Sequence, residues 1–191
     1  MDLKGSKTEK NLLKSFAGES QARNRYTYFS GVAKNEGYVQ ISAIFSETAD
    51  NESIHAKRMF KFLESGSALE ITASYSAGRM GKTAENLEAS AAGENEEHTL
   101  LYPSFAKTAR EEGFDKVDEM YENISVAEQQ HEKRYRALLA NVKNGTVFKK
   151  DKPVTWRCSK CGFIHTNTEA LAHCPACNHP QAHFEILAEN W

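Results

Sequence analysis

Two segments of this 191-residue chain with helical periodicity each carry a glutamate followed three residues later by a histidine. The pairs are Glu52 with His55 and Glu128 with His131. Residues three apart on a helix lie side by side, and both pairs interrupt a helix face that is otherwise apolar. Burying an uncompensated carboxylate is strongly unfavourable. The pattern therefore predicts that a positive charge is buried beside each pair.

An internal repeat relates the two pairs. Residues 16–20 (FAGES) match residues 91–95 (AAGEN), which pairs Glu19 with Glu94. The offset is 75 residues there and 76 in later matching segments, so the second copy holds one extra residue near Pro103. Two copies of one helical hairpin predict a bundle with pseudo-twofold symmetry, in which inward side chains face their own copies.

The repeat brings six potential metal ligands to the inner faces of four helices. One Glu on each of two helices and a Glu-x-x-His on each of the others form the ligand set of carboxylate di-iron bundles. Four carboxylates balance two divalent cations, and one neutral imidazole completes the shell of each. A single Glu-x-x-His is usually a solvated surface pair, whereas two on apolar faces favour a metal site. The predicted ligands are Glu19, Glu52, His55, Glu94, Glu128 and His131.

The repeat is broken at Glu97, which stands where the first copy has Ala22. Because Glu97 follows Glu94 by three residues on the same face, it is a seventh candidate ligand without a symmetry mate. The alternative is a solvent-facing charge in the acidic run ENEEH. His98 is nearly as well placed, and a role beside the ligands stays open for it.

Two tyrosines occupy positions two turns beyond the first glutamate of each copy. Tyr26 follows Glu19, and Tyr102 follows Glu94. Their hydroxyls could hydrogen-bond the carboxylates or a substrate. The simpler interpretation is that both are amphipathic core tyrosines whose hydroxyls are satisfied.

All four cysteines lie in the C-terminal part of the chain as two Cys-x-x-Cys pairs, twelve residues apart. Two such pairs supply a tetrahedral set of four thiolates, which selects iron or zinc. In a reducing compartment this clustering indicates metal ligation rather than disulfides. The predicted ligands are Cys158, Cys161, Cys174 and Cys177.

The cysteine module is too small for an ample core, so a bound metal should contribute much of its folding free energy. Four histidines of this region exceed the needs of a closed four-sulfur site, and they are interpreted as surface residues. His179, next to the last cysteine pair, could also line an electron path. The aromatic residues expected to pack around the metal are Trp156, Phe163, Phe184 and Trp191.

The elements that must position these side chains are four long helices. Short connections join the first helix to the second and the third to the fourth, whereas a long segment separates the two pairs. Two hairpins with one long crossover form a ferritin-like four-helix bundle. Pro103 should bend the third helix or loosen one turn. Periodicity and the glycines that follow predict helices at 8–36, 39–65, 82–112 and 115–144.

The fold class expected is therefore mostly α, with a small β-rich metal module at the end. The bundle should comprise residues 1–146 and the module residues 153–191, with 147–152 as a linker or short strand. With 40% hydrophobic and 26% charged residues and a net charge of -2, the composition gives no support to a nucleic-acid or membrane-surface partner. No apolar run approaches the ~20 residues that span a bilayer, and no signal peptide is recognisable, so a cytoplasmic location is expected.

Beyond these patterns, the sequence resembles the rubrerythrin family over essentially its whole length. The segments FAGESQARNRY, ETADNESIHAKR, SAAGENEEH, YPSFAKTAREEG and AEQQHEKR follow one another in the family's order. The tail, with CSKCG and CPAC, resembles rubredoxin, which favours iron over zinc at the cysteines. One departure is Asn178, where rubredoxins have glycine. Asparagine tolerates the left-handed conformation, so the second cysteine knuckle should still form.

The resemblance implies a role for each ligand in the bundle. Glu52 and Glu128 would bridge two non-haem irons, Glu19 would bind the first iron, and Glu94 with His131 would hold the second.

His55 and Glu97 would be the catalytic, exchanging ligands of the first iron. The neutral imidazole suits the ferrous ion, and the carboxylate suits the ferric ion.

The implied activity is the reduction of hydrogen peroxide to water, as protection against oxidative stress. A single iron in the four-cysteine site would re-reduce the iron pair, with electrons ultimately from NAD(P)H through a separate reductase or rubredoxin. The family also implies a homodimer, in which the module of one subunit approaches the bundle of the other.

Two alternative functions stay open. A ferritin-like bundle with the same ligands can oxidise and store iron, although the cysteine module is hard to reconcile with a closed storage shell. The chain could also be a non-enzymatic interaction protein, with a zinc ribbon attached to a helical bundle.

Overall fold

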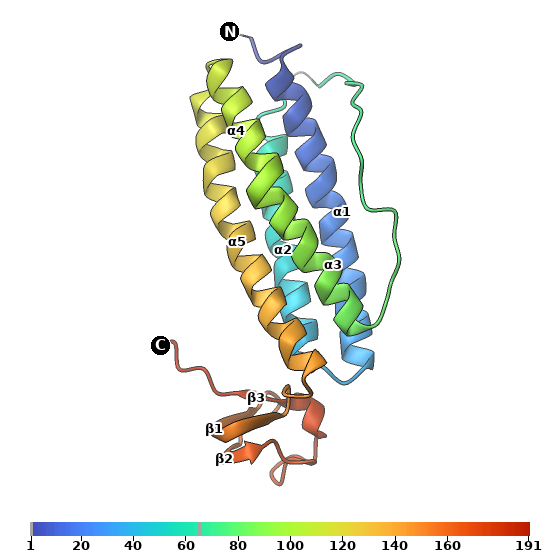
Figure 1. Ribbon diagram of the computed structural model, residues 1–191, viewed down its shortest axis with the longest axis vertical. Helices are drawn as coiled ribbons and strands as arrows, with labels where there is room; N and C mark the ends of the chain where they lie inside the picture. Colours follow the sequence, from blue (N-terminus) through green and yellow to red (C-terminus); the bar gives the residue numbers. More distant parts are fainter. Residues whose placement is uncertain (1, 65) are drawn as a thin grey trace.

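The computed structural model describes residues 2–64 and 66–191. Long helices form an antiparallel bundle, and a small sheet lies at one end of it (Figure 1). No helix in these two ranges is both long and apolar enough to cross a membrane. The elements are α1 (Lys7–Asn35), α2 (Val39–Phe60), α3 (Thr83–Glu96), the π-helix η1 (Glu97–Leu101), α4 (Tyr102–Glu111), α5 (Asp115–Lys143), β1 (Lys149–Cys158), β2 (Ile164–Glu169), the 3₁₀ helix η2 (Gln181–His183) and β3 (Phe184–Ile186).

Local sequence signals account for four of the helix ends. The side chain of Ser6 caps α1 by accepting a hydrogen bond from the amide of Glu9 at 3.0 Å. Gly37, Gly113 and Gly145, just beyond the ends of α1, α4 and α5, have φ angles of 85°, 79° and 66°. Glycine adopts this left-handed conformation without strain. These three predicted helix ends are confirmed to within one residue.

The predicted end of the second helix is wrong. α2 ends at Phe60, and position 65, where the helix was expected to end, lies outside the described residues. The amides of Phe62 and Leu63 bond to carbonyls three residues back, which tightens the chain into a turn. Both side chains still pack on the apolar core. Phe62 and Leu63 therefore continue the apolar spacing of the helix, although they lie beyond its last residue.

The extra residue of the second copy is accommodated in a π-helical turn. The turn η1 joins α3 to α4 immediately before Tyr102 and Pro103. A π turn holds more residues than an α turn, so one insertion is absorbed without breaking the helix. The prediction that one turn near Pro103 loosens is confirmed.

The two hairpins pack as related copies. α1 packs mainly on α2, while α3 and α4 pack on α5, and the connecting residues 66–82 return along the outside of α1 (Figure 1). At one end the amide of Thr8 donates to Glu112 at 2.8 Å. At the other end the amide of Thr83 donates to Glu36 at 3.1 Å. Each helix start is therefore held by the matching glutamate of the other hairpin.

The bundle interior has an apolar cluster on each side of a polar layer. Along α1, Leu12 belongs to one cluster and Tyr26 to the other, and Glu19 lies between them. The first cluster contains Tyr121 and Met59, and four of the eleven buried residues of the second are aromatic. Apolar packing on both sides holds the polar layer in place and separates it from solvent at the bundle ends.

The C-terminal module is a three-stranded antiparallel sheet in the order β2-β1-β3. Trp156 is buried at its centre and donates from Nε1 to the carbonyl of Asn167 at 3.0 Å. Trp191 is 91% exposed, so its predicted packing around the metal site is wrong. β1 begins at Lys149, inside the segment 147–152 expected to link the domains. The domain division itself stays a prediction.

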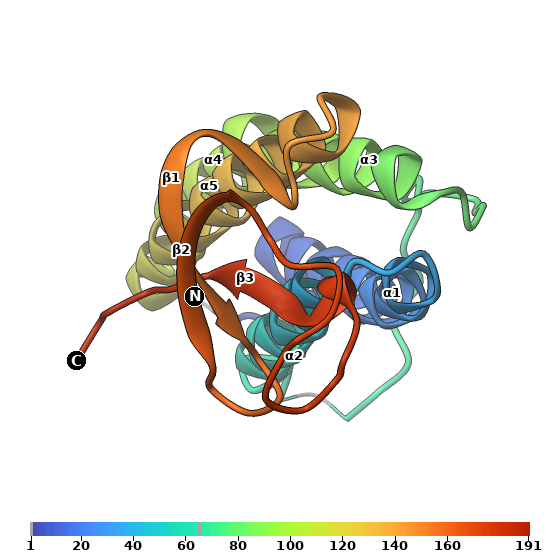
Figure 2. The same ribbon diagram turned by 90° about the horizontal axis from the view of Figure 1, so that it is seen from below.

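The module lies across one end of the bundle (Figure 2). Tyr38, at the α1–α2 turn, stacks on Phe148 with ring centroids 6.3 Å apart and planes 9° apart. Lys150 donates to the side chain of Asn141 at 3.2 Å, which ties β1 to α5. These contacts place the cysteines beyond the end of the bundle where α1 turns into α2.

Candidate metal centres

The six predicted ligands of the bundle meet in its polar layer. α1 contributes Glu19, α2 contributes Glu52 with His55, and α5 contributes the second Glu-x-x-His pair, while α3 supplies the remaining glutamate. The four carboxylates are at most 1% exposed. The structure thus brings together the side chains that the repeat and the periodicity predicted to face inward.

Their donor atoms form two overlapping sets of four, and within each set the atoms lie within 4.8 Å of one another. Glu52 and Glu128 belong to both sets. The first set is completed by Glu19 and His55, and the second by Glu94 and His131. This is the arrangement expected of two neighbouring metal positions with two shared carboxylates.

The shared carboxylates present one oxygen to each position. His55 Nδ1 lies 2.9 Å from Glu52 Oε2 and 2.9 Å from Glu128 Oε1. His131 Nδ1 lies 3.3 Å from Glu52 Oε1 and 2.8 Å from Glu128 Oε2. Because the two oxygens of each glutamate face different histidines, both glutamates are oriented as bridges.

The buried polar atoms of this layer fit a pair of cations. Buried polar atoms normally have partners, and an unpaired one is costly. Carboxylate oxygens accept coordination bonds as well as hydrogen bonds, and imidazole nitrogen is a common partner for iron or zinc. Among the atoms left without a hydrogen bond are Glu19 Oε2, Glu52 Oε1, Glu94 Oε2, both Glu128 oxygens and His131 Nδ1.

The pKa shifts of the polar layer also indicate that positive charge is needed there. Burial, and then repulsion from Glu128 and Glu52, raise the pKa of Glu19 well above its usual range. Burial and repulsion from Glu52 raise the pKa of Glu94 to about 8. Burial would lower the pKa of His131, but its contacts with the carboxylates raise it to about 12. In protein without metal, a protonated imidazole thus substitutes for cationic charge, which metal ions would supply in full.

Both tyrosines hydrogen-bond a glutamate of the opposite copy. Tyr26 donates to Glu94 Oε1 at 2.6 Å, and Tyr102 donates to Glu19 Oε1. Both residues are buried core tyrosines with satisfied hydroxyls, as predicted, and the groups that satisfy them are the carboxylates. Each hydroxyl occupies one oxygen of a terminal ligand and leaves the other oxygen for a metal. Sequence spacing identified the tyrosines but not the crossed pairing.

Glu97 is the exception among the predicted ligands. It is half-buried at the first position of η1 and belongs to neither donor set. Burial, and then repulsion from Glu94 and Glu128, raise its pKa well above the usual range. Its carboxyl group is therefore electrostatically coupled to the metal site while lying outside it. Its role as a ligand stays a prediction.

A polar cluster that sequence reasoning missed joins this part of the chain to α5. Glu132 accepts hydrogen bonds from His98 Nε2 at 2.5 Å, Arg136 Nε at 2.5 Å and Asn95 Nδ2 at 3.1 Å. Burial opposes its ionisation, but these bonds lower the pKa of Glu132 to about 2. His98 thus contacts the neighbour of a predicted ligand, His131. Glu132 carried no signal, because a glutamate on a helix is usually a solvated side chain.

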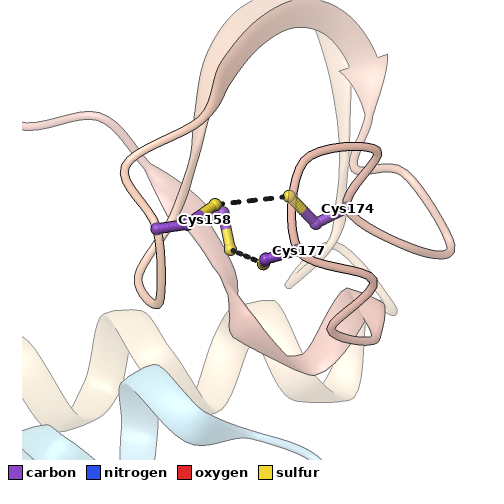
Figure 3. Close-up of side chains that lie close together, drawn as sticks. Cys158, Cys174 and Cys177 are labelled. Carbon is purple, nitrogen blue, oxygen red and sulfur yellow. Dashed lines mark hydrogen bonds between the residues drawn. The ribbon is translucent and has the colours of Figure 1, made fainter.

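The four cysteines converge in the module, as Figure 3 illustrates for three labelled side chains. Cys158 Sγ lies 3.7 Å from Cys177 Sγ, and Cys161 Sγ lies 3.6 Å from Cys174 Sγ. A disulfide requires about 2.05 Å. A tetrahedral metal with bonds of about 2.3 Å separates its sulfurs by roughly 3.8 Å. The distances therefore match a four-thiolate metal site.

The two cysteine knuckles have matching backbone turns. The amide of Gly162 bonds to the carbonyl of Cys158 at 2.9 Å, and that of Asn178 bonds to Cys174 at 2.8 Å. Their φ angles are 80° and 58°. The prediction that asparagine sustains the second knuckle is confirmed, because it adopts the left-handed conformation.

The sequence predicts that the four histidines of the module are surface residues. That prediction is wrong for three of them. His179 Nδ1 lies 3.3 Å from Cys177 Sγ, and His165 Nε2 accepts from the amide of Leu171 at 3.3 Å. His183 is also partly buried, and its ring lies edge-on to that of His179. Only the fourth, His173, is exposed among these residues, all of which lie in the described part of the chain.

Comparison with known proteins agrees with both centres. A family model described as rubrerythrin matches residues 10–139, and one described as the rubredoxin-like domain of rubrerythrin matches residues 156–185. Rubrerythrin of Nitratidesulfovibrio vulgaris is 57% identical over 99% of this chain and 98% of that protein. Rubrerythrin of Porphyromonas gingivalis is 57% identical over 99% of this chain and 94% of that protein.

Solved structures give the same result for the fold. Nigerythrin in its fully reduced, all-ferrous state has a TM-score of 0.64 and 31% identity, covering 96% of this chain and 91% of that one. Bacterioferritin of Mycobacterium tuberculosis has a TM-score of 0.62 at 22% identity, covering 72% of this chain and 87% of that one. The latter likeness shows the ferritin-like fold alone.

Proposed function

Because the chain belongs to the rubrerythrin family, we propose that it is a peroxidase that reduces hydrogen peroxide to water. The observation that carries this proposal is the pair of overlapping donor sets with two shared carboxylates. When bound there, two irons would supply the two electrons that the reduction of one peroxide requires. Protection of the cytoplasm against oxidative stress would follow from this activity.

The residues of the layer have distinct tasks in this proposal. Glu52 and Glu128 would hold both metals, since each presents one oxygen to each position. Tyr26 and Tyr102 keep the terminal glutamates oriented by donating to one oxygen of each. The apolar clusters on either side keep bulk water out, which strengthens electrostatic interactions within the site.

His55 and Glu97 are the proposed exchanging ligands. The side chain of His55 is 14% exposed, twice the value for His131, so it lies nearer the edge of the layer. Glu97 lies outside the donor set that includes His55. An imidazole suits a ferrous ion and a carboxylate suits a ferric ion, so the exchange would stabilise both oxidation states.

The four-cysteine iron is the proposed entry point for electrons from a reductase or rubredoxin, ultimately from NAD(P)H. Glu52 lies thirteen residues from Val39, the first residue of α2, which is roughly 20 Å along the helix axis. The module lies beyond that end of the bundle (Figure 1). This separation within one chain supports a homodimer in which the module of one subunit serves the bundle of the other.

Stopped-flow spectroscopy of the iron-loaded, reduced protein tests the proposal. Mixing with hydrogen peroxide should oxidise the bundle irons and then restore the red colour of the ferric four-cysteine site. Cys161→Ser should abolish reduction by an external donor, while its chemically reduced bundle still reacts once with peroxide. Failure of the reduced wild-type protein to consume peroxide would refute the peroxidase. A mineral core formed from excess ferrous ion would instead support iron storage.

A further inference from the structure

A pocket of about 570 Å³ leads toward the first donor set. It lies between α1 and the α3–α4 helix, and residues 72–76 of the crossover cover it. Glu97 and Tyr102 are among the residues that line it, and Tyr102 donates a hydrogen bond to Glu19. The pocket therefore reaches residues next to the first donor set, although none of the four donors of that set lines it.

The pocket is much larger than hydrogen peroxide needs. A water molecule occupies roughly 30 Å³ in the liquid, and hydrogen peroxide is of the same order. Pockets of about 300–1,000 Å³ usually hold organic ligands. Small residues, among them Gly18, Ala92 and Gly93, keep the walls apart, and Tyr75 and Phe105 provide aromatic surface.

The cover of the pocket is held in place by specific contacts. The hydroxyl of Tyr75 donates to the carbonyl of Lys14 at 2.9 Å, and the side-chain amide of Gln21 donates to the carbonyl of Ser76 at 2.9 Å. A Cβ atom at Gly18 would already lie 3.8 Å from the Tyr75 ring. The crossover thus forms a wall of defined shape above the helices.

We propose that this pocket binds the organic group of alkyl hydroperoxides, so that the protein reduces them as well as hydrogen peroxide. The hydroperoxide group lies toward Glu97, and the organic group lies against Tyr75 and Phe105. The O–O bond breaks, and two electrons and two protons convert ROOH into ROH and water. The electrons come from the same reduced site and external donor as in the proposed peroxidase, on which this inference rests.

Steady-state kinetics with cumene hydroperoxide and hydrogen peroxide test this assignment on the iron-loaded protein. Wild type should reduce both. Ala92→Leu, on an exposed helix position of the pocket wall, should lower the ratio of kcat/KM for cumene hydroperoxide to that for hydrogen peroxide about tenfold. Ala43→Leu, at an exposed alanine of α2 outside the pocket, should leave the ratio unchanged.

Calorimetric titration with 2-phenyl-2-propanol, the alcohol formed from cumene hydroperoxide, provides a readout other than turnover. The iron-loaded wild type should bind this alcohol, and Ala92→Leu should not. Reduction of hydrogen peroxide alone, or equal ratios in wild type and Ala92→Leu, would overturn the assignment. If neither peroxide is reduced, the proposed peroxidase activity is refuted. Binding of the alcohol then decides separately whether the pocket takes an organic group.

Discussion

The two helical hairpins share the residues that build the metal cage and differ in those that surround one side of it. Each hairpin supplies three metal donors, a tyrosine to the other hairpin's terminal glutamate, and a glutamate to the other hairpin's first helix. Only the second has the π turn, which begins at Glu97 where the first has Ala22. The second also has Glu132 where the first has Ala56.

The differences are concentrated around a single segment. Glu97 opens the π turn, His98 is the next residue in it, and Glu132 binds His98 from α5. The same turn contributes to the pocket through Glu97 and Leu101. The symmetric elements thus supply the two donor sets, whereas the π turn and the residues around it make the surroundings of the two sets differ.

The largest expected effect is at the shared donors. Glu128→Ala should impair metal loading at both positions, because this carboxylate belongs to both donor sets. Glu94→Ala should weaken chiefly one position, with a loss of affinity of about 100-fold or more. Metal content after equilibrium dialysis distinguishes the two variants. Equal loss of metal in both would show that the positions do not fill independently.

The metal-free Glu128→Ala variant should also be more stable than metal-free wild type. The substitution removes one of several mutually repelling buried carboxylates. Thermal unfolding of both proteins after chelation measures this. A lower unfolding temperature for the variant would mean that contacts of the carboxylate with His55 and His131 outweigh the repulsion.

The next largest effect is expected on turnover with peroxide when Glu97, which has no counterpart in the first hairpin, is replaced. Glu97→Ala should leave metal content unchanged, since Glu97 belongs to neither donor set. It should slow turnover with peroxide by about 10- to 100-fold, as the loss of a positioned charged group does. Glu96→Ala, an exposed neighbour, is the matched control. Unchanged turnover in Glu97→Ala would contradict the exchange of ligands.

Removing the charge of Glu132 tests whether α5 holds the π turn. Glu132→Gln should weaken the hydrogen bonds from His98 and Arg136, each worth about 1.5–3 kcal/mol when charged. Amides of residues 97–101 should then exchange hydrogen faster. Glu47→Gln, which removes a surface partner of Arg134, is the control and should not affect these amides. Unchanged exchange in Glu132→Gln would show that the turn is held by its own backbone.

The smallest expected effect is on the free energy of unfolding, when the glutamates that bind the first residues of α1 and α3 are replaced. Burial raises the pKa of Glu112, but hydrogen bonds from Thr8 and Lys7 outweigh it and lower the pKa below 4.5. Its contribution to stability is therefore present above pH 4.5 and is lost as the pH falls through the folded-state pKa. Glu112→Gln should lower the free energy of unfolding by up to about 1 kcal/mol at neutral pH, and by less in acid.

The matching variant of the other hairpin is the natural comparison. Glu36→Gln should cost less, because Glu36 accepts one amide hydrogen bond from Thr83, whereas Glu112 accepts three bonds from α1. Denaturant unfolding of the metal-free proteins at neutral and acidic pH measures both. A difference between wild type and Glu112→Gln that does not shrink in acid would rule out the carboxylate charge as its cause.

Much of the candidate site could be predicted because its signals are local or repeated. The Glu-x-x-His spacing sets two side chains on one helix face, and the 75-residue offset identifies their counterparts. The two Cys-x-x-Cys spacings predict a tetrahedral set of four thiolates. Periodicity failed at Phe62 and Leu63, which are apolar at helical spacing but lie in a turn. Apolar residues at helical spacing indicate that their side chains are buried. A buried turn can show the same spacing, so the pattern does not distinguish a turn from a helix.

By itself, the sequence determined which side chains face the interior and which four cysteines act together, because helix periodicity and knuckle spacing depend on short stretches of chain. Only the tertiary structure decided that Tyr26 binds Glu94 rather than a glutamate of its own hairpin, that Glu132 accepts a hydrogen bond from His98 in the π turn, and that the crossover covers a pocket. These contacts depend on how helices are rotated and aligned against each other, and packing between distant segments sets that alignment.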